Sequence, residues 1–190
     1  MRVPDEPDAM TRTIDDAAVD ELGDRLYDAY RRGAPLDPAT LPDCTVADGY
    51  AIQRAVTDRR RTDEGPVVGY KVGFTSAAIQ AELGVDEPAY GRVLADTVRP
   101  EGRLDADDLI DPKIEPEIAV KLSDPLDPPV TPVDALSAIA AVIPVIEVVD
   151  SRVDDWTTTA GSAVADDALA ARVVHGSRTV DPAALDLALE

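Results

Sequence analysis

The sequence predicts an α+β fold that is built around a mixed β-sheet within one domain. Segments 67–75 and 143–152 have the alternation or the β-branched composition of strands, and segments with helical periodicity precede and separate them. The strands and helices interleave without the strict βαβ repeat of a doubly wound sheet. A chain of 190 residues can bury one substantial core but is too short for two full domains.

The chain is predicted to have three parts. Residues 1–13 are rich in proline and charge and should be disordered, because they offer little apolar surface to bury. Residues 14–66 should form a helical region, with apolar side chains at helical spacing up to Tyr30 and a second helix capped by Thr45. Residues 67–190 should form the domain that contains the sheet.

Strands dominate the pattern of the predicted sheet domain. Lys71 lies between two glycines of its first strand, which leaves room for a ligand to approach the backbone. Near the C-terminus, Leu185, Leu187 and Leu189 alternate with other residues as in a half-buried strand that needs a partner. In chain order, the predicted elements are a strand at 67–75, a helix at 77–83, strands at 92–98 and 111–120, a helix at 133–142 and a strand at 143–152.

The charge balance excludes some classes of partner. With 38 acidic and 18 basic residues, the formal net charge is -20, which disfavours binding to nucleic acids or to anionic membranes. We interpret this composition as a halophilic acidic surface, suited to a salt-rich cytoplasm where screening weakens repulsion. Cys44 is the only cysteine, and the sequence shows neither a signal peptide nor a bilayer-length apolar run, so we expect a soluble cytoplasmic protein.

Two glutamates stand one residue apart in the strand predicted at 111–120. On one face of that strand, Glu115 and Glu117 should repel each other unless they are solvated, share a proton or bind a cation. Glu147 lies in an apolar strand, where a lone carboxylate is costly to bury. If the two strands are neighbours, the three carboxylates form a site for Mg²⁺ or Mn²⁺. A solvated edge strand is the alternative, and the spacing alone leaves both open.

Several ordered motifs carry a family resemblance. They are "DGYAIQRAV", "GYKVGFTS", "LGVDEPAYG", "PKIEPEIAV", "EVVDSRVDDW" and "VADDA". In this order and spacing they resemble the 2-keto-4-pentenoate hydratase family of the fumarylacetoacetate hydrolase superfamily, from about Val46 to Gly176. The resemblance implies a β-sheet roll of the type found in the C-terminal domain of fumarylacetoacetate hydrolase. It also implies an incomplete C-terminus, because the family continues well beyond Glu190.

The resemblance also implies a site and a reaction. It assigns Glu115, Glu117 and Glu147 as ligands of Mg²⁺ or Mn²⁺, and it makes Lys71 and Asp86 the candidates for proton transfer. The implied reaction is hydration of a 2-hydroxy-2,4-dienoic acid from aromatic catabolism, which gives a 4-hydroxy-2-oxo acid. A decarboxylase of 2-oxo acids such as 4-oxalocrotonate is one alternative, and a truncated, non-catalytic partner subunit is another. Relatives are usually oligomers, and an unpartnered sheet edge favours a homo-oligomer here as well.

A few other residues have open or structural interpretations. His175 is the only histidine and is interpreted as structural or solvent-exposed, since no second histidine or cysteine is available as a metal ligand. Asp150 and Arg152 could orient the glutamates or the substrate, or form a structural ion pair. In "VADDALA", Asp167 replaces an amide of the family motif and Leu169 replaces a hydroxyl, so substrate contacts there should differ.

Overall fold

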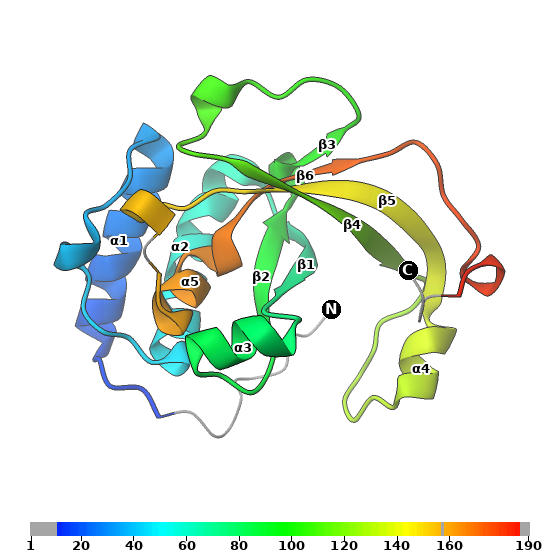
Figure 1. Ribbon diagram of the computed structural model, residues 1–190, viewed down its shortest axis with the longest axis horizontal. Helices are drawn as coiled ribbons and strands as arrows, with labels where there is room; N and C mark the ends of the chain where they lie inside the picture. Colours follow the sequence, from blue (N-terminus) through cyan, green and yellow to red (C-terminus); the bar gives the residue numbers. More distant parts are fainter. Residues whose placement is uncertain (1–10, 157, 187–190) are drawn as a thin grey trace.

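Two long helices pack against each other at one side of the computed structural model, which describes residues 11–156 and 158–186 (Figure 1). They are α1 (Asp16–Arg32) and α2 (Val46–Glu64), and they confirm the helices predicted from the apolar spacing. Their shared core consists of buried apolar side chains from both helices: Val19, Leu22, Leu26, Ala51, Ile52 and Val56. Burial of these side chains is the main force that holds two such helices together.

The buried side chain of Asp48 fixes the start of α2. Thr45 caps the helix by accepting a hydrogen bond from the Asp48 N–H, and the Asp48 carboxylate accepts bonds from the N–H and hydroxyl of Thr45. The same carboxylate accepts bonds from the N–H and hydroxyl of Thr13 and from the N–H of Ile14. Thr13, the last residue of the segment predicted to be disordered, is therefore held against α2, whereas residues 1–10 lie outside the described part of the chain.

The described strands form two sheets, and one of them is mixed. β1 (Val67–Gly73) and β2 (Ala89–Leu94) make an antiparallel pair. The other sheet has the order β3-β6-β5-β4, in which β3 runs parallel to β6 and the other neighbours are antiparallel. Its strands are β3 (Val98–Pro100), β4 (Lys113–Leu122), β5 (Ile139–Val149) and β6 (Ala170–His175). The predicted α+β class with a mixed sheet is confirmed.

Three short α-helices of the described chain lie between the strands. α3 (Ala77–Leu83) begins after the predicted cap Ser76 and ends at Gly84, which has the left-handed backbone of a helix C-cap. α4 (Pro132–Ser137) joins β4 to β5, and α5 (Ala160–Ala165) packs against α2. None of the helices in the described ranges combines the length and the apolar character that a bilayer span requires.

The prediction of a helix at 133–142 is wrong in its second half. α4 ends at Ser137, and from Ile139 onward the chain already belongs to β5, which pairs along its length with β4. A short apolar run is compatible with a helix or with a buried strand. The extended antiparallel pairing with β4 decides in favour of the strand.

The strand predicted at 92–98 is divided between the two sheets. β2 begins earlier than predicted, at Ala89. A turn at Ala95–Thr97 then carries the chain to β3. The Thr97 hydroxyl donates to the Leu94 carbonyl at 2.8 Å, so a backbone acceptor is satisfied where β2 ends.

The chain returns to β5 near its described end. Val180 exchanges two backbone hydrogen bonds with Val142, at 2.8 and 2.9 Å. A helical turn at Pro182–Ala184 follows, so the strand predicted from the alternating leucines has not begun at Leu185. The remaining residues of that predicted strand, 187–190, lie outside the described ranges.

We expect Asp48→Ala to lower the free energy of unfolding at neutral pH by about 2–3 kcal/mol, because several buried donors lose a charged acceptor. Burial alone would raise the pKa of Asp48, but hydrogen bonds from Thr13 and Thr45 outweigh it and hold the pKa well below its usual range. The stabilisation is therefore fully present above about pH 4 and is lost as the pH falls, since the unfolded chain binds the proton first. Denaturant unfolding of both proteins at several pH values measures this difference.

Asp134→Ala is the matched control, since Asp134 forms the same capping box with Thr131 at the start of the exposed helix α4. This substitution should lower the free energy of unfolding by less than Asp48→Ala, because water can replace the hydrogen bonds of the exposed Asp134 side chain. An Asp48→Ala effect that stays constant down to about pH 3 would contradict this assignment of the pKa.

Candidate metal centre

Three glutamates meet on one face of the β4–β5 pair. Glu115 of β4 lies directly opposite Glu147 of β5 in the antiparallel register, and Glu117 follows on the same face of β4. Each residue contributes a carboxylate oxygen to a group whose atoms all lie within 4.8 Å of one another. The structure therefore brings together the three residues that were predicted as metal ligands.

Glu147 is the least solvated member of this glutamate trio. Its side chain is 1% exposed, and neither carboxylate oxygen accepts a hydrogen bond from a described residue. The Lys71 ammonium lies 3.2 Å from Oε2, which makes an ion pair without well-directed hydrogen-bond geometry. Burial raises the pKa of Glu147 to about 7; the Lys71 charge opposes this shift, and Glu117 and Glu115 add to it. Buried carboxylate oxygens with unused lone pairs are suitable ligands for a hard divalent cation.

The other two members of the trio lie closer to solvent. Glu117 is half-buried and Glu115 is exposed. Burial raises the pKa of Glu117, the Lys71 charge lowers it, and the neighbouring Glu115 raises it further. The trio thus extends from the interior to the surface, so an ion can reach the buried carboxylate from the solvent side.

Close backbone packing positions the Lys71 side chain so that its ammonium contacts the Glu147 carboxylate. Lys71 lies opposite Gly91 in the β1–β2 pair, and its ammonium also donates to the Ala168 carbonyl at 3.0 Å. A Cβ atom at position 91 would lie 2.3 Å from the Asp167 carbonyl oxygen and 3.1 Å from Lys71 Cδ. Glycine is therefore required at this position for the lysine side chain and the 167–169 segment to pack as they do.

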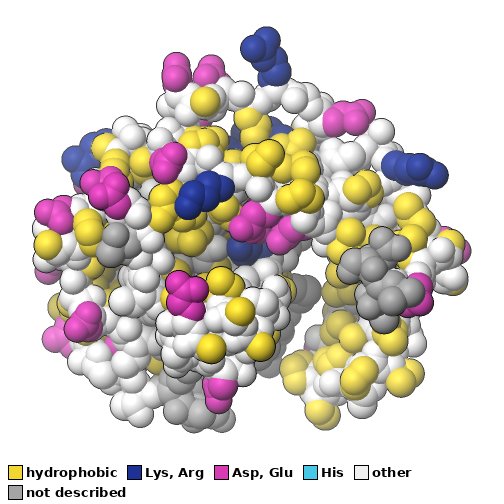
Figure 2. All heavy atoms as spheres, viewed as in Figure 1, with side chains coloured by type: hydrophobic (Ala, Val, Ile, Leu, Met, Phe, Trp, Pro, Cys, Tyr) yellow, Lys and Arg dark blue, Asp and Glu magenta, His cyan; other side chains and the backbone are white. Residues whose placement is uncertain are grey.

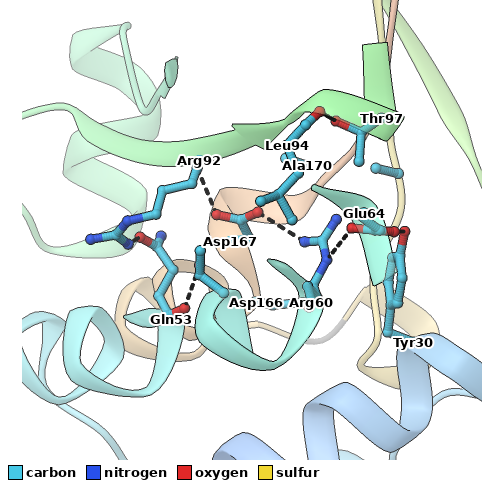
Figure 3. Close-up of polar contacts among 12 residues, drawn as sticks. Tyr30, Gln53, Arg60, Glu64, Arg92, Leu94, Thr97, Asp166, Asp167 and Ala170 are labelled. Carbon is cyan, nitrogen blue, oxygen red and sulfur yellow. Dashed lines mark hydrogen bonds and ion pairs between the residues drawn. The ribbon is translucent and has the colours of Figure 1, made fainter. Parts of the chain in front are cut away.

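A buried network of polar side chains supports the 167–169 segment, to which both of these carbonyl groups belong (Figure 3). Asp167 accepts hydrogen bonds from the N–H of Arg92 at 2.7 Å and from the guanidinium of Arg60 at 3.0 Å. Asp167, Ala168 and Leu169 all have left-handed backbone conformations. Such a run is strained for residues with a side chain and persists only where its surroundings over-determine it. Of the two departures from the family motif, Asp167 serves this network and Leu169 lines a cavity.

Sequence reasoning missed Gln53, which joins three elements of this network. Gln53 lies inside α2 and donates to the carbonyls of Tyr90 and Val164 at 2.9 Å each. It also accepts a hydrogen bond from Arg92 (Figure 3). It therefore ties α2 to β2 and α5. The only signal in the sequence is its position within the apolar run "YAIQRAV", where a buried amide must find partners.

A cavity of about 400 Å³ opens beside the trio. Figure 2 shows acidic and basic side chains together near the centre of this face, between α3 and β4. The polar part of the cavity lining includes Glu115, Glu117 and Lys71. The space that was predicted beside the lysine is present at Gly73. The apolar lining includes Phe74, Ile79, Trp156 and Leu169. This volume and mixed lining suit a small organic acid.

Asp86, the second residue predicted to transfer protons, does not line the cavity. It is exposed in the loop after α3. Its role stays a prediction, whereas Lys71 lies in contact with the buried Glu147.

The remaining candidates have structural partners. Arg152 is buried and pairs with Asp166, and it also donates to two backbone carbonyls, so it forms a structural ion pair. Asp150 accepts two backbone N–H groups at 2.8 Å each and so fixes the chain that enters β4. His175 ends β6, and its Nδ1 lies 3.0 Å from the next carbonyl along the chain. None of these three residues lines the cavity.

Comparisons with known proteins find clear relatives of this chain. No protein-family model matches it. It is 38% identical over 174 residues to the 2-keto-4-pentenoate hydratase of Paraburkholderia xenovorans strain LB400, a match that covers 90% of this chain and 65% of that protein. It is also 38% identical over 179 residues to the 2-hydroxypent-2,4-dienoate hydratase of Pseudomonas putida, with 92% of this chain and 81% of that protein covered.

A solved structure has the same fold. The 4-oxalocrotonate decarboxylase from Pseudomonas putida G7, complexed with magnesium and adipate, matches with a TM-score of 0.87 at 34% sequence identity. The match covers 93% of this chain and 69% of that chain. This chain thus spans 65% of the Paraburkholderia hydratase and a larger share, 81%, of the Pseudomonas hydratase. Identity at this level over nine-tenths of the sequence shows that the chain belongs to the 2-keto-4-pentenoate hydratase family.

Proposed function

We propose that this protein is a metal-dependent hydratase that converts 2-hydroxy-2,4-dienoic acids to 4-hydroxy-2-oxo acids in aromatic catabolism. The observation that carries the proposal is the buried Glu147 carboxylate, which lacks hydrogen bonds from described residues and faces Glu115, Glu117 and Lys71. This set of oxygen donors fits a hard cation, and we infer Mg²⁺ or Mn²⁺. The names of the relatives, which include a 2-hydroxypent-2,4-dienoate hydratase, support the reaction.

The groups of the site have distinct roles in this proposal. Glu115, Glu117 and Glu147 would hold the cation, which when bound supplies Lewis-acid stabilisation of negative charge on the substrate oxygens. Lys71 is held beside the trio, so its Nζ can move a proton to or from a substrate carbon in the cavity. Ketonisation of the dienol conjugates the remaining double bond, and water then adds at C4. Asp86 is the candidate that takes the proton from this water.

The proposal also covers the type of sheet, the oligomeric state and the cellular compartment. We propose a sheet roll of the fumarylacetoacetate hydrolase type after a helical region that ends near residue 66, supported by the match to the decarboxylase. A homo-oligomer is supported by the outer edge of β4 and its exposed side chains, among them Ile114 and Ile118. A cytoplasm of high salt content is supported by the net charge of -20 and the single cysteine.

Glu147→Gln should abolish binding of Mg²⁺ and Mn²⁺, because it removes the most buried ligand of the trio. Mg²⁺ should raise the unfolding temperature of the wild type but not that of the variant, because only a protein that binds the ion is stabilised by it. Titration calorimetry with each ion, and thermal unfolding with and without Mg²⁺, measure the two effects. Glu101→Gln, at an exposed glutamate beyond β3, is the control and should bind ions normally. Ion binding by Glu147→Gln would refute the metal site.

Lys71→Met should lower kcat by about 100-fold or more and leave ion binding intact, because it removes a proton carrier but no metal ligand. Turnover of 2-hydroxypenta-2,4-dienoate, followed by its ultraviolet absorbance, is the measurement. Lys121→Met removes the same charge from the far end of β4 and should turn over normally. Wild-type turnover by Lys71→Met would remove this residue from the mechanism.

Asp86→Asn should lower kcat by about tenfold or more if this carboxylate moves the proton of the attacking water. Glu87→Gln changes the next residue in the same way and should retain activity. Because both positions are exposed, both variants should unfold at the wild-type temperature, which separates an effect on catalysis from one on stability. Equal turnover by the two variants would show that Asp86 has no part in the reaction.

A further inference from the structure

A second cavity, of about 270 Å³, lies on the face of the mixed sheet that points away from the glutamate trio. Arg99 pairs with Val174 in the parallel β3–β6 ladder, and Arg172 lies two residues before Val174, so both arginines point to one face. Glu147 lies opposite Val173, the neighbour of Arg172, so the trio points to the other face. The two cavities share none of their lining residues.

The charges around this second cavity are not neutralised by one another. Arg103, on the loop that follows β3, lines the cavity together with Arg99 and Arg172. The side chains of Arg99 and Arg103 make no ion pair, hydrogen bond or aromatic contact with a described residue. Asp105 and Asp108 also line the cavity, but neither forms an ion pair with an arginine of the described chain. Guanidinium groups gathered in this way repel one another, so an anion between them would be stabilised.

Contacts from the helical region hold Arg172 in place. Its Nη1 donates to the Tyr30 hydroxyl and to the Ala171 carbonyl, at 2.9 Å each, and the Tyr30 hydroxyl donates in turn to Glu64. Its Nε and Nη2 groups donate to no described residue. Because a guanidinium has five N–H donors in a rigid fork, Arg172 is positioned in advance and still has donors for a ligand.

The arrangement of the three arginines favours a phosphate group over a carboxylate. Guanidinium forks bind both kinds of anion. A carboxylate presents two oxygens in one plane, whereas the oxygens of a phosphate point in several directions and can meet forks that come from three segments of the chain. The volume is just below that of sites for drug-sized ligands, which begin at about 300 Å³. The cavity therefore suits a phosphate ion or a small phosphate ester.

We propose that Arg99, Arg103 and Arg172 form a binding site for a phosphate group, carried either by free phosphate or by a small phosphate ester. Asp105 and Asp108 can accept hydrogen bonds from a hydroxyl of the same ligand. The site uses none of the trio and none of the residues beside it, so it binds its ligand whether or not the metal centre holds an ion.

The test is titration calorimetry of the full chain with inorganic phosphate, glycerol 3-phosphate and acetate, without divalent metal and at constant ionic strength. The wild type should bind at least one of the two phosphates about tenfold or more tightly than acetate. The phosphate that binds more tightly identifies the source of the group. Arg99→Met and Arg103→Met should each weaken this binding by about tenfold or more, as expected for one charge-assisted contact. Both positions are exposed, so both variants should unfold at the wild-type temperature.

Arg178→Met is the matched control, because it removes an exposed arginine that does not line this cavity, and it should bind phosphate as the wild type does. Glu147→Gln should also retain phosphate binding, which separates this site from the metal centre. Equal affinities of the wild type for acetate and the phosphates would overturn the proposal, and so would equal losses in Arg103→Met and Arg178→Met. Loss of phosphate binding in Glu147→Gln would assign the anion to the trio and overturn it as well.

Discussion

The buried carboxylate of Glu147 is the constraint on which the rest of the site depends. A carboxylate without hydrogen bonds is costly in a protein interior, and among the described residues only Lys71 forms an ion pair with it. The antiparallel register sets Glu115 opposite Glu147, and a slip of one residue would turn these side chains to the other face. Tight packing at Gly91 then brings the lysine from a different sheet. Strand pairing and backbone packing together create the site.

Left-handed backbone is concentrated around the cavity. Of the described non-glycine residues with positive φ, four line it: Phe74, Trp156, Ala168 and Leu169. Strain of this kind persists only when other contacts hold it in place. The bonds from Arg60 to Asp167 and from Gln53 to neighbouring backbone supply that support from α2. The N-terminal helical region, residues 14–66, therefore stabilises the cavity wall although none of its residues lines the cavity.

The period of a strand was sufficient to predict that Glu115 and Glu117 share a face, and the family motifs identified Glu147 as their partner. The register that joins them depends on residues far apart in the chain, which one sequence does not display. The helix at 133–142 was wrong in part because a short apolar run has no unique period. The buried network was missed because its partners come from different elements. The motifs also suggested Asp86, which is exposed after α3 and does not line the cavity.

The position of β4 at the edge of its sheet has a consequence for the ion. At Glu147, β5 is bonded to β6 on one side and to β4 on the other, whereas β4 is the outermost described strand and pairs with β5 alone. In the proposed metal site, the ion would therefore have one ligand on a strand that is paired on both sides and two ligands on an edge strand. Glu147 would set where the ion sits, and the strand that carries Glu115 and Glu117 could shift to match the ionic radius. Tolerance of cations of different size would then be a property of the sheet margin rather than of a flexible loop.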